Sequence, residues 1–277
     1  MQLGKIELFI VSDGTMRLDG GAMFGIVPKT LWEKVYPADD KNRILIALNC
    51  LLIKTGGKNI LVDTGIGDRW DAKFLEIYDI DRSVTLTASL RKLGLKPEDI
   101  DIVINTHLHF DHCGGNTRKD EKGRWVATFP NARYIVQKGE WRDAYVNSEL
   151  RKGSYLPDCF EPVAEAGLFD LVEGDVEVTQ GVRVVRTPGH TRYHQSVLVE
   201  SEGEKAFYLG DTVPSPCHLP LNYMMGYDLY PETLLRTRKK ILRQAFRERW
   251  LMVFEHDPRM AMGYLRMGKK GYELEAQ

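Results

Sequence analysis

The sequence predicts an α/β protein in which helices cover the outside of a β-sheet. Residues 59–62 and 100–105 are compact apolar runs typical of buried strands, and residues 83–93 between them have helical spacing. This order of strand, helix and strand is typical of layered α/β folds. Polar side chains of metal-binding type follow several predicted strands directly, so we expect a functional site at one edge of the sheet.

Short apolar or alternating runs bounded by turn residues predict the strands of this fold. In chain order they are residues 5–13, 44–55, 59–62, 100–105, 133–137, 168–172, 176–179, 182–186, 195–200, 205–209, 250–254 and 261–267. Gly56 and Gly57 separate the second and third runs, which is typical of a hairpin turn. The tail after Met267 is short and polar, and no element is predicted there.

Helical spacing marks three segments: residues 83–93, 138–146 and 232–247. In the first of them, we expect Ser83 to cap the N-terminus and Gly94 to end the helix. Residues 115–130 and 154–162 have no clear period and predict loops, and the second is long enough to act as a lid. No internal repeat or low-complexity linker divides the chain, so we expect one domain over residues 1–277.

A glycine-rich segment, residues 20–32, has the sequence GGAMFGIVPKTLW. Glycine permits turns and close approach of the backbone, while Met23, Phe24 and Trp32 supply apolar surface. The segment is therefore either a hairpin with core side chains or a loop that forms one wall of a pocket.

The composition indicates a globular chain with a sizeable core. Of 277 residues, 43% are hydrophobic and 28% are charged, and the formal net charge is -1, so we expect no nucleic-acid partner. No apolar run reaches the roughly 18 residues needed to span a bilayer, and the N-terminus lacks the pattern of a signal peptide. We therefore expect a cytoplasmic location, no membrane partner, and free thiols at all the cysteines: Cys50, Cys113, Cys159 and Cys217.

One stretch, THLHFDHCGG at residues 106–115, carries four candidate metal ligands directly after a predicted buried strand. His107 and His109 lie two residues apart, so on an extended segment their side chains share a face. Asp111 and His112 are adjacent and face another direction, which suits two neighbouring metals better than one. Imidazole and carboxylate are ligands that zinc and similar cations prefer.

Further candidates stand at the ends of other predicted strands. His190 lies in TPGHT, Asp211 in GDT and His256 in EHD. A pair of metals roughly 3.5–4 Å apart needs more ligands than a single zinc and usually shares a carboxylate. We expect His107, His109 and His190 at one metal, Asp111, His112 and His256 at the other, and Asp211 between them.

Asp63, in VDTG, also follows a predicted strand and precedes a glycine turn. Alone, this pattern is typical of an aspartate that caps a turn. Beside the downstream metal-type stretch, we interpret Asp63 as a residue that orients a ligand or the loop that carries it.

The chain resembles the metallo-β-lactamase superfamily. THLHFDH matches its HxHxDH signature, while VDTG, TPGH, GD and EHD match its other motifs, so the resemblance covers nearly the whole chain. It implies a four-layer αββα sandwich with a dinuclear metal site along one edge of two sheets. Within the superfamily the chain looks most like the lactonase and methyl-parathion-hydrolase branch, whose string THLHFDHAGGN is close to THLHFDHCGGN.

There is one departure from that branch. Familiar quorum-quenching lactonases carry a tyrosine three residues after the bridging aspartate, where this chain has Pro214. Because that tyrosine touches the substrate carbonyl, His218, Tyr223 or Tyr227 would have to replace it here.

We expect a metal-dependent hydrolase that acts on a small neutral ester or lactone by attack of a metal-bound hydroxide. Asp111 or Asp211 would take up the proton or pass it to the leaving group. The segment 20–32 and the loop 154–162 are the expected pocket walls. The expected substrate-binding residues are Met23, Phe24, His218 and Tyr223, with Trp32 and Met224 as further apolar surface.

Alternatives remain at the level of the sequence. The same site supports phosphotriester or thioester hydrolysis, and a redox diiron module or a non-catalytic metal-binding protein is less favoured. Zinc is the expected metal, with manganese, iron and cobalt as alternatives. A small molecule is the expected partner, and a homodimer is left open.

Overall fold

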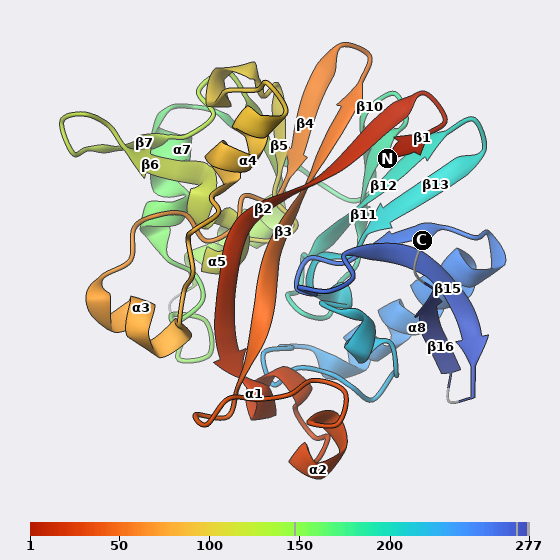
Figure 1. The fold of residues 1–277 in the computed structure, drawn as a ribbon. Coiled ribbons are helices and arrows are strands. Elements are labelled where there is room, and N and C mark those ends of the chain that lie inside the picture. The colour runs from red at the N-terminus through yellow and green to blue at the C-terminus, as the bar shows by residue number, and fades with distance from the viewer. Residues whose placement is uncertain (147, 270, 276–277) are drawn as a thin grey trace.

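The computed structural model describes residues 1–146, 148–269 and 271–275 and contains two seven-stranded sheets that face each other (Figure 1). The first sheet has the order β1 (Gln2–Leu3), β2 (Ile6–Asp19), β3 (Arg43–Thr55), β4 (Lys58–Val62), β5 (Ile102–Ile104), β8 (Arg133–Gln137) and β9 (Phe169–Val172). The second has the order β10 (Val176–Thr179), β11 (Val182–Arg186), β12 (Gln195–Ser201), β13 (Glu204–Tyr208), β14 (Leu251–Val253), β15 (Met262–Gly268) and β16 (Gly271–Glu275).

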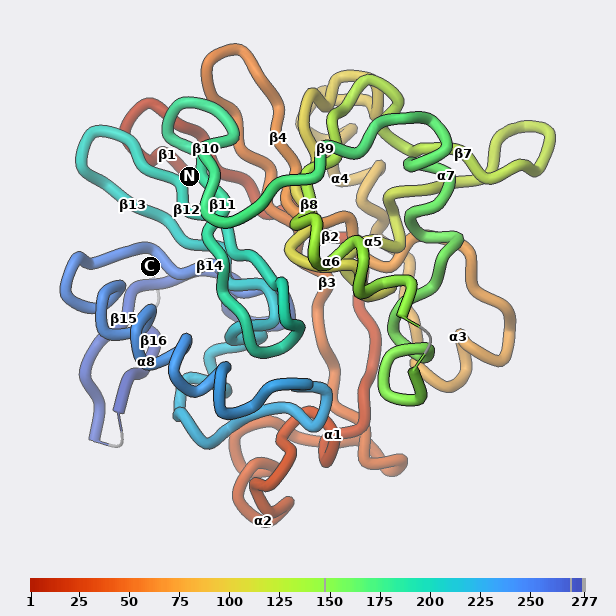
Figure 2. The backbone as a smooth tube through the Cα atoms, turned by 180° about the vertical axis from the view of Figure 1, so that it is seen from behind, coloured from red at the N-terminus to blue at the C-terminus, as the bar shows by residue number. Residues whose placement is uncertain are grey.

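Helices cover the outer face of each sheet, so the expected αββα sandwich is confirmed (Figures 1 and 2). On the outside of the first sheet, α4 and α7 share a core with its strands, and α8 does the same on the second sheet. The helices are α1 (Gly20–Phe24), α2 (Lys29–Trp32), α3 (Ala72–Tyr78), α4 (Leu86–Lys92), α5 (Phe110–Cys113), α6 (Lys138–Ala144), α7 (Glu161–Glu165) and α8 (Pro231–Arg247). Single 3₁₀ turns are η1 (Pro97–Asp99), η2 (Gly114–Asn116), η3 (Pro157–Cys159), η4 (Gly210–Thr212) and η5 (Pro216–His218).

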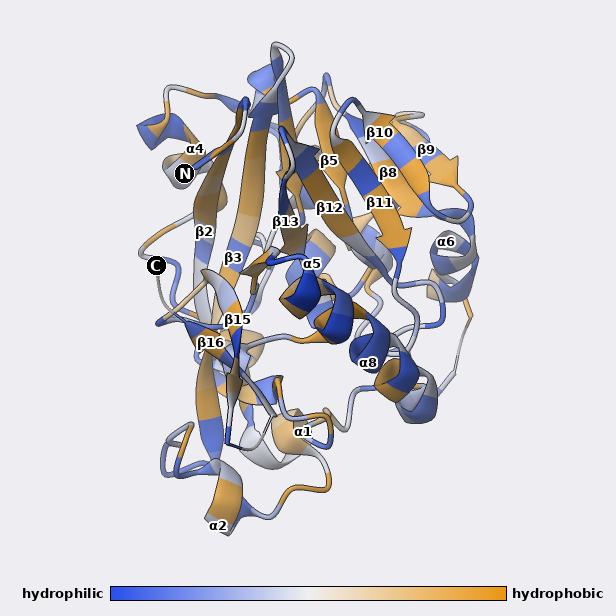
Figure 3. Cartoon of the chain, turned by 90° about the vertical axis from the view of Figure 1, so that its right-hand side faces the viewer, coloured by the Kyte–Doolittle hydropathy of each residue, from blue (hydrophilic) through white to orange (hydrophobic). Residues whose placement is uncertain are grey.

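Side chains of the central strands alternate between the core that separates the two sheets and the cores under the outer helices. In β4, Ile60 and Val62 point into the core between the sheets, while Leu61 points outward under α4. In β14, Leu251 and Val253 face the same inner core, while Met252 packs under α8. Side chains of a strand alternate between faces, so a strand covered on both sides is apolar at every position. Figure 3 shows the result as largely orange strands beside the mostly blue surface of α8.

The strand directions bring the metal-type residues to one edge. Strands β4, β5, β8 and β9 run parallel, as do β13 and β14, so their carboxyl ends meet at a common edge. Direct hydrogen bonds join the two sheets there: Gln195 N–H donates to Thr106 O at 2.9 Å, and Asn49 N–H donates to Glu255 O at 3.0 Å. Ligands that follow strands of different sheets are therefore held against one another.

The predicted hairpin at Gly56 and Gly57 is confirmed, and both glycines have positive φ values. The glycine-rich segment 20–32 is instead two short helices, α1 and α2. Asp19 caps α1 by accepting the Ala22 N–H at 2.8 Å. A Cβ at Gly20 would stand 2.3 Å from the Trp32 ring, so the glycine there serves close packing.

Three other expectations about elements were wrong. Helix α4 is capped by Thr85, whose hydroxyl accepts the Ala88 N–H, and not by Ser83. The segment 115–130 contains a two-stranded hairpin, β6 (Thr117–Lys119) with β7 (Trp125–Ala127). The polar tail after Met267 forms the edge strand β16, and Ala276 and Gln277 lie outside the described residues.

Within the described part of the chain, no helix is long and apolar enough to cross a membrane. The four cysteines are free thiols, as expected.

Candidate metal centre

The stretch after β5 changes conformation in the middle, and this divides its ligands. His107 lies outside any helix or strand, and His109, whose backbone is extended, is the N-cap of the single helical turn α5. Asp111 and His112 lie within that turn, so their side chains leave the backbone in a different direction. All four side chains are almost fully buried.

The structure brings together all seven of the expected metal ligands. Their donor atoms form two groups, within each of which all atoms lie within 4.8 Å of one another. We call His107, His109 and His190 the first half of the centre and Asp111, His112 and His256 the second half. Asp211 belongs to the first group and also reaches the second.

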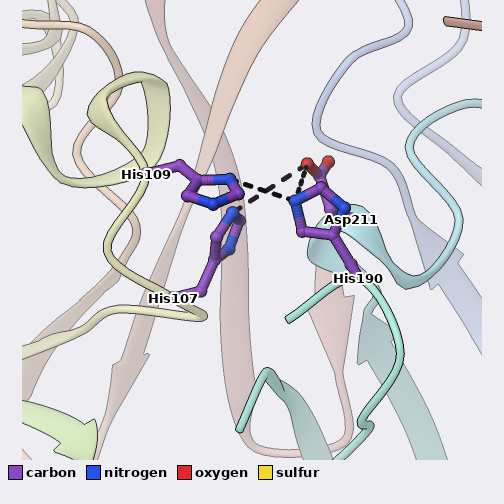
Figure 4. A group of neighbouring side chains, drawn as sticks. All are labelled: His107, His109, His190 and Asp211. Carbon is purple, nitrogen blue, oxygen red and sulfur yellow. Dashed lines mark hydrogen bonds and ion pairs between the residues drawn. The ribbon is translucent and has the colours of Figure 1, made fainter. Parts of the chain in front are cut away.

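Asp211 stands between the halves and offers an oxygen to each. Its Oδ2 lies 3.1 Å from His190 Nε2, and its Oδ1 lies 3.2 Å from His256 Nε2. His109 Nδ1 lies 3.1 Å from His190 Nε2 across the first half (Figure 4). Asp111 Oδ2 is 3.8 Å from His112 Nε2 within the second half.

The donor atoms fit divalent cations. Among the residues that the structure describes, the buried His107 Nε2 has no hydrogen-bond partner. Burial, reinforced by His112 and His109, holds the pKa of His107 well below its usual value, so the ring is neutral and one of its nitrogens carries a free lone pair. Burial works against the charge of Asp211, but His190 and the second-half imidazoles hold its pKa well below the usual range. Imidazole nitrogens around a carboxylate are the donor set of transition-metal sites.

The second ring nitrogen of four ligands is bound by an oxygen, which fixes the tautomer and the direction of the first nitrogen. His190 Nδ1 lies 2.9 Å from Asp228 Oδ1, and His256 Nδ1 donates to the carbonyl oxygen of Ala47 at 2.9 Å. His107 Nδ1 lies 3.0 Å from the hydroxyl of Thr106.

His112 has one hydrogen-bond partner, Asp63, and a second carboxylate, Glu255, forms an ion pair with the same nitrogen. Its Nδ1 lies 3.1 Å from Asp63 Oδ2 and 2.8 Å from Glu255 Oε2. Asp63 also accepts the backbone N–H and the hydroxyl of Thr106, both at 2.7 Å. Asp63 thus contacts the ligand segment at two places: at His112 and at Thr106, the residue before His107.

Sequence reasoning missed several residues around the ligands. Glu255 could have been predicted from the sequence, because it stands beside His256 at the end of a buried strand. Burial raises the pKa of the Glu255 carboxyl to about 8. His194 was left unassigned, yet its Nε2 accepts the Asp211 N–H at 3.2 Å and its Nδ1 lies 2.8 Å from the Thr187 hydroxyl. Asp228 lies in an irregular segment that gave no signal.

A cavity of about 190 Å³ opens above the two halves. Its lining consists of Leu18, Met23, Tyr78, His109, Phe110, Asp111, Gly153, Ser154, His190, Asp211, Met225, Tyr227 and His256. Of the loop 154–162, only Ser154 belongs to this lining. None of the described residues that line the cavity is a lysine or an arginine.

Of the four expected substrate-binding residues, the structure brings only Met23 to the cavity. Phe24 and His218 are fully buried and stack on each other at 4.7 Å, and Tyr223 packs edge-on to Phe24 at 5.9 Å. His218 Nε2 donates to the Met23 carbonyl oxygen at 2.9 Å, so these three residues support the wall from behind. Trp32 stacks on the far side of Phe24, and Met225 lines the cavity in place of Met224.

Comparison with known proteins places these features in context. Residues 45–256 match the model of the metallo-beta-lactamase superfamily. An N-acyl homoserine lactonase of Bacillus cereus is 30% identical over 240 residues, which cover 78% of this chain and 83% of the relative. A solved structure of a probable metal-dependent hydrolase from Staphylococcus aureus has a TM-score of 0.90 at 30% identity and covers 100% of this chain and 99% of that one.

A further solved structure is an N-acyl homoserine lactone hydrolase with the product N-hexanoyl-L-homoserine bound at its catalytic metal centre. Its TM-score is 0.71 at 26% identity, and the match covers 93% of this chain and 95% of that one.

Proposed function

The chain is a metal-dependent hydrolase of the metallo-β-lactamase superfamily, and we propose that it opens a lactone ring that carries an apolar substituent. The observation that carries this proposal is a buried centre of seven ligands on the floor of a narrow cavity without cationic side chains. Two of the proteins named above, the Bacillus cereus lactonase and the hydrolase with bound product, act on N-acyl homoserine lactones, so a lactone of that kind is the first substrate to test here.

We propose that the halves hold two divalent cations, most simply zinc, with manganese, iron or cobalt as alternatives for the same donors. His107, His109 and His190 would hold one, Asp111, His112 and His256 the other, and Asp211 would contact both. Bound cations of this kind lower the pKa of water and stabilise negative charge on an oxygen atom.

The side chain of Asp111 lines the floor of the cavity in which we propose that the substrate binds. Its Oδ2 is 3.9 Å from His256 Nε2, so it belongs to the second half and still faces the opening. We assign to Asp111 the proton removed from the attacking water, which it then delivers to the alkoxide oxygen released when the ring opens. Asp211 keeps the halves together and stays ionised throughout.

The walls favour an uncharged substrate. Leu18, Met23, Phe110 and Met225 supply apolar surface around the opening. A substrate carboxylate would find no lysine or arginine among these lining residues, whereas an acyl chain would replace water on the apolar wall. The neutral ester bond then comes to lie over the ligands at the floor.

Tyr227 is our candidate for the hydroxyl that this branch places after the bridging aspartate. The carbonyl oxygen of Pro214 accepts the His256 N–H at 2.9 Å, so Pro214 supports a ligand strand and offers no hydroxyl. Tyr227 lines the cavity, and burial raises its pKa to about 12, so it is a protonated donor at neutral pH. Tyr227→Phe should lower kcat for a lactone while leaving metal content unchanged.

The test is a substrate panel on the metal-loaded enzyme: an N-acyl homoserine lactone, an unsubstituted lactone, an aryl ester, a phosphotriester and a thioester. We expect the highest kcat/KM for the acylated lactone, and loss of turnover after chelation that is reversed by added metal. A phosphotriester or thioester preferred by tenfold or more would replace the lactone proposal with that reaction.

We also propose a location, the partners and an assembly for the enzyme. Free cysteines support a cytoplasmic location, and a net charge of -1 supports the absence of a nucleic-acid partner. We propose no membrane partner and retain a homodimer as the assembly to test by light scattering.

A further inference from the structure

His109 differs from the other four ligand histidines in how it is held. The other imidazoles each turn a second nitrogen toward an oxygen of the protein, whereas no described residue accepts or donates a hydrogen bond at His109 Nε2. The edge of the His109 ring instead meets the ring of Tyr155, with centroids 4.7 Å apart and planes at 75°. Packing against Tyr155 therefore takes the place of an outer hydrogen bond.

Tyr155 is itself fixed by a buried carboxylate. Its hydroxyl donates to Glu140 Oε1 at 2.7 Å, and both side chains are almost completely buried. The neighbouring Ser154 accepts the Phe110 N–H at 2.9 Å, which docks the tyrosine segment on the ligand stretch. The position of the His109 ring thus depends on where Glu140 holds Tyr155.

Glu140 also reaches both ligand loops of the first half directly. Its Oε1 accepts the backbone N–H of Leu108, the residue between His107 and His109, at 3.3 Å. Its Oε2 accepts the hydroxyl of Thr191, the residue after His190, at 2.7 Å. One side chain on α6 therefore connects two ligand segments that are far apart in the sequence.

Burying a carboxylate in this position costs free energy unless hydrogen bonds compensate for the lost hydration. Glu140 is fully buried, and no lysine, arginine or histidine of the described part of the chain forms an ion pair with it. Burial raises its pKa, while its three donors lower it. An apolar side chain would fill the same space without a desolvation penalty but could not accept from Leu108, Tyr155 and Thr191 together.

We propose that Glu140 is a positioning residue for the first half of the centre. Its carboxylate sets the distance and orientation between His109 and His190 and thereby the affinity of that half for a cation. The inference rests on metal binding at the centre and not on the identity of the substrate, so a failed lactone assay leaves it standing.

The test measures metal affinity with one half removed at a time. His256→Ala impairs the second half and leaves the first complete, and His190→Ala does the reverse. Each chain is stripped with a chelator and titrated with Co²⁺ in competition with a chromophoric chelator, so no turnover is needed. Glu140→Gln, of nearly equal size, is then added to both backgrounds.

We expect Glu140→Gln to weaken Co²⁺ binding roughly 10–100-fold in the His256→Ala chain, the range for partners that orient ligands. In the His190→Ala chain the loss should stay under about threefold. Asp143→Asn is the matched control, because Asp143 lies on the same helix and pairs with Arg151 at 3.1 Å but forms no described hydrogen bond with either ligand loop. It should change neither affinity by more than about threefold.

Equal losses in both backgrounds would make Glu140 a general structural residue and overturn the proposal, as would unchanged affinity in a folded Glu140→Gln chain. If that variant does not fold, Tyr155→Phe and Thr191→Val each remove one contact and carry the test. Each should weaken the first half alone, and a loss in the second half of the same size would contradict the inference.

Discussion

The two halves of the metal centre are held by different means. In the second half, His112 has two buried carboxylates on one nitrogen, Asp63 and Glu255, and His256 is bound by a backbone carbonyl. In the first half, His190 has the single partner Asp228, and His109 is held by ring packing. Where two carboxylates stand beside one nitrogen, one remains when the other is removed, whereas the loss of a single contact leaves none. We therefore expect the second half to be tighter and the first half to be the more easily emptied.

Removing the shared ligand should erase the difference between the halves. Asp211→Ala takes an oxygen from both, so we expect loss of most bound metal and a fall in kcat/KM on the order of 10³-fold or more, since single electrostatic donors are worth about 10²–10³. Metal analysis by mass spectrometry and steady-state kinetics measure the two effects. An active variant that retains two metals would show that Asp211 is not shared.

Removing one half at a time should reveal the difference. His190→Ala and His256→Ala each delete one histidine with the same chemistry, and each chain should keep about one metal per molecule. We expect the His190→Ala chain, with its second half intact, to hold that metal more tightly. The order of affinities in a chelator competition decides this, and the reverse order would contradict the role we give to redundant partners.

Outer carboxylates give a finer comparison. Asp228→Asn removes the negative charge from the single outer partner of His190, so first-half affinity should fall by about 10–100-fold. Glu255→Gln leaves Asp63 on His112, so the loss in the second half should be under about tenfold. The same competition titration measures both variants, and equal losses would mean that the second carboxylate on His112 adds nothing.

A pH effect should arise behind the cavity, outside both halves. Burial lowers the pKa of His218 to about 3, whereas an unfolded histidine titrates near 6.5. Because the folded-state pKa is the lower one, the unfolded chain binds the proton first, and stability present above about pH 6.5 is lost as the pH falls toward 3. At pH 5.5 this loss is about 1.4 kcal/mol.

Replacing His218 with Asn should remove that part of the acid sensitivity. Urea unfolding of the metal-loaded wild type and variant at pH 7.5 and 5.5 provides the comparison. The wild type should lose about 1.4 kcal/mol more than the variant between the two values. The same loss in both would assign the acid sensitivity to the ligand histidines.

The sequence revealed the ligands because they follow apolar strands whose directions are strongly determined. Apolar residues on both faces, as in β4 and β14, allow only a covered central strand, so the polar residues beyond them must meet at an edge. The spacing predicted that Asp111 and His112 face another direction than His107 and His109, but it did not predict the helical turn that produces this direction. These patterns are local, so they can be recognised in the sequence without knowledge of the tertiary contacts.

The walls and outer partners depend on contacts between distant segments. Phe24 was expected in the pocket because it is an apolar residue of the glycine-rich segment, but α1 makes one turn there and places Phe24 in the core. Glu140 and Asp228 reach the centre only through the docking of α6 and of an irregular segment. No spacing in the sequence encodes either contact, so they could not be predicted from it.

The division of the ligands between two sheets also orders events during translation. The ribosome makes His107, His109, Asp111 and His112 with the first sheet, but His190 and His256 emerge later, with the second. A nascent chain that has completed β9 therefore has two ligands of each half and neither half complete. Complete cation sites form only after the second sheet has been made and has packed against the first.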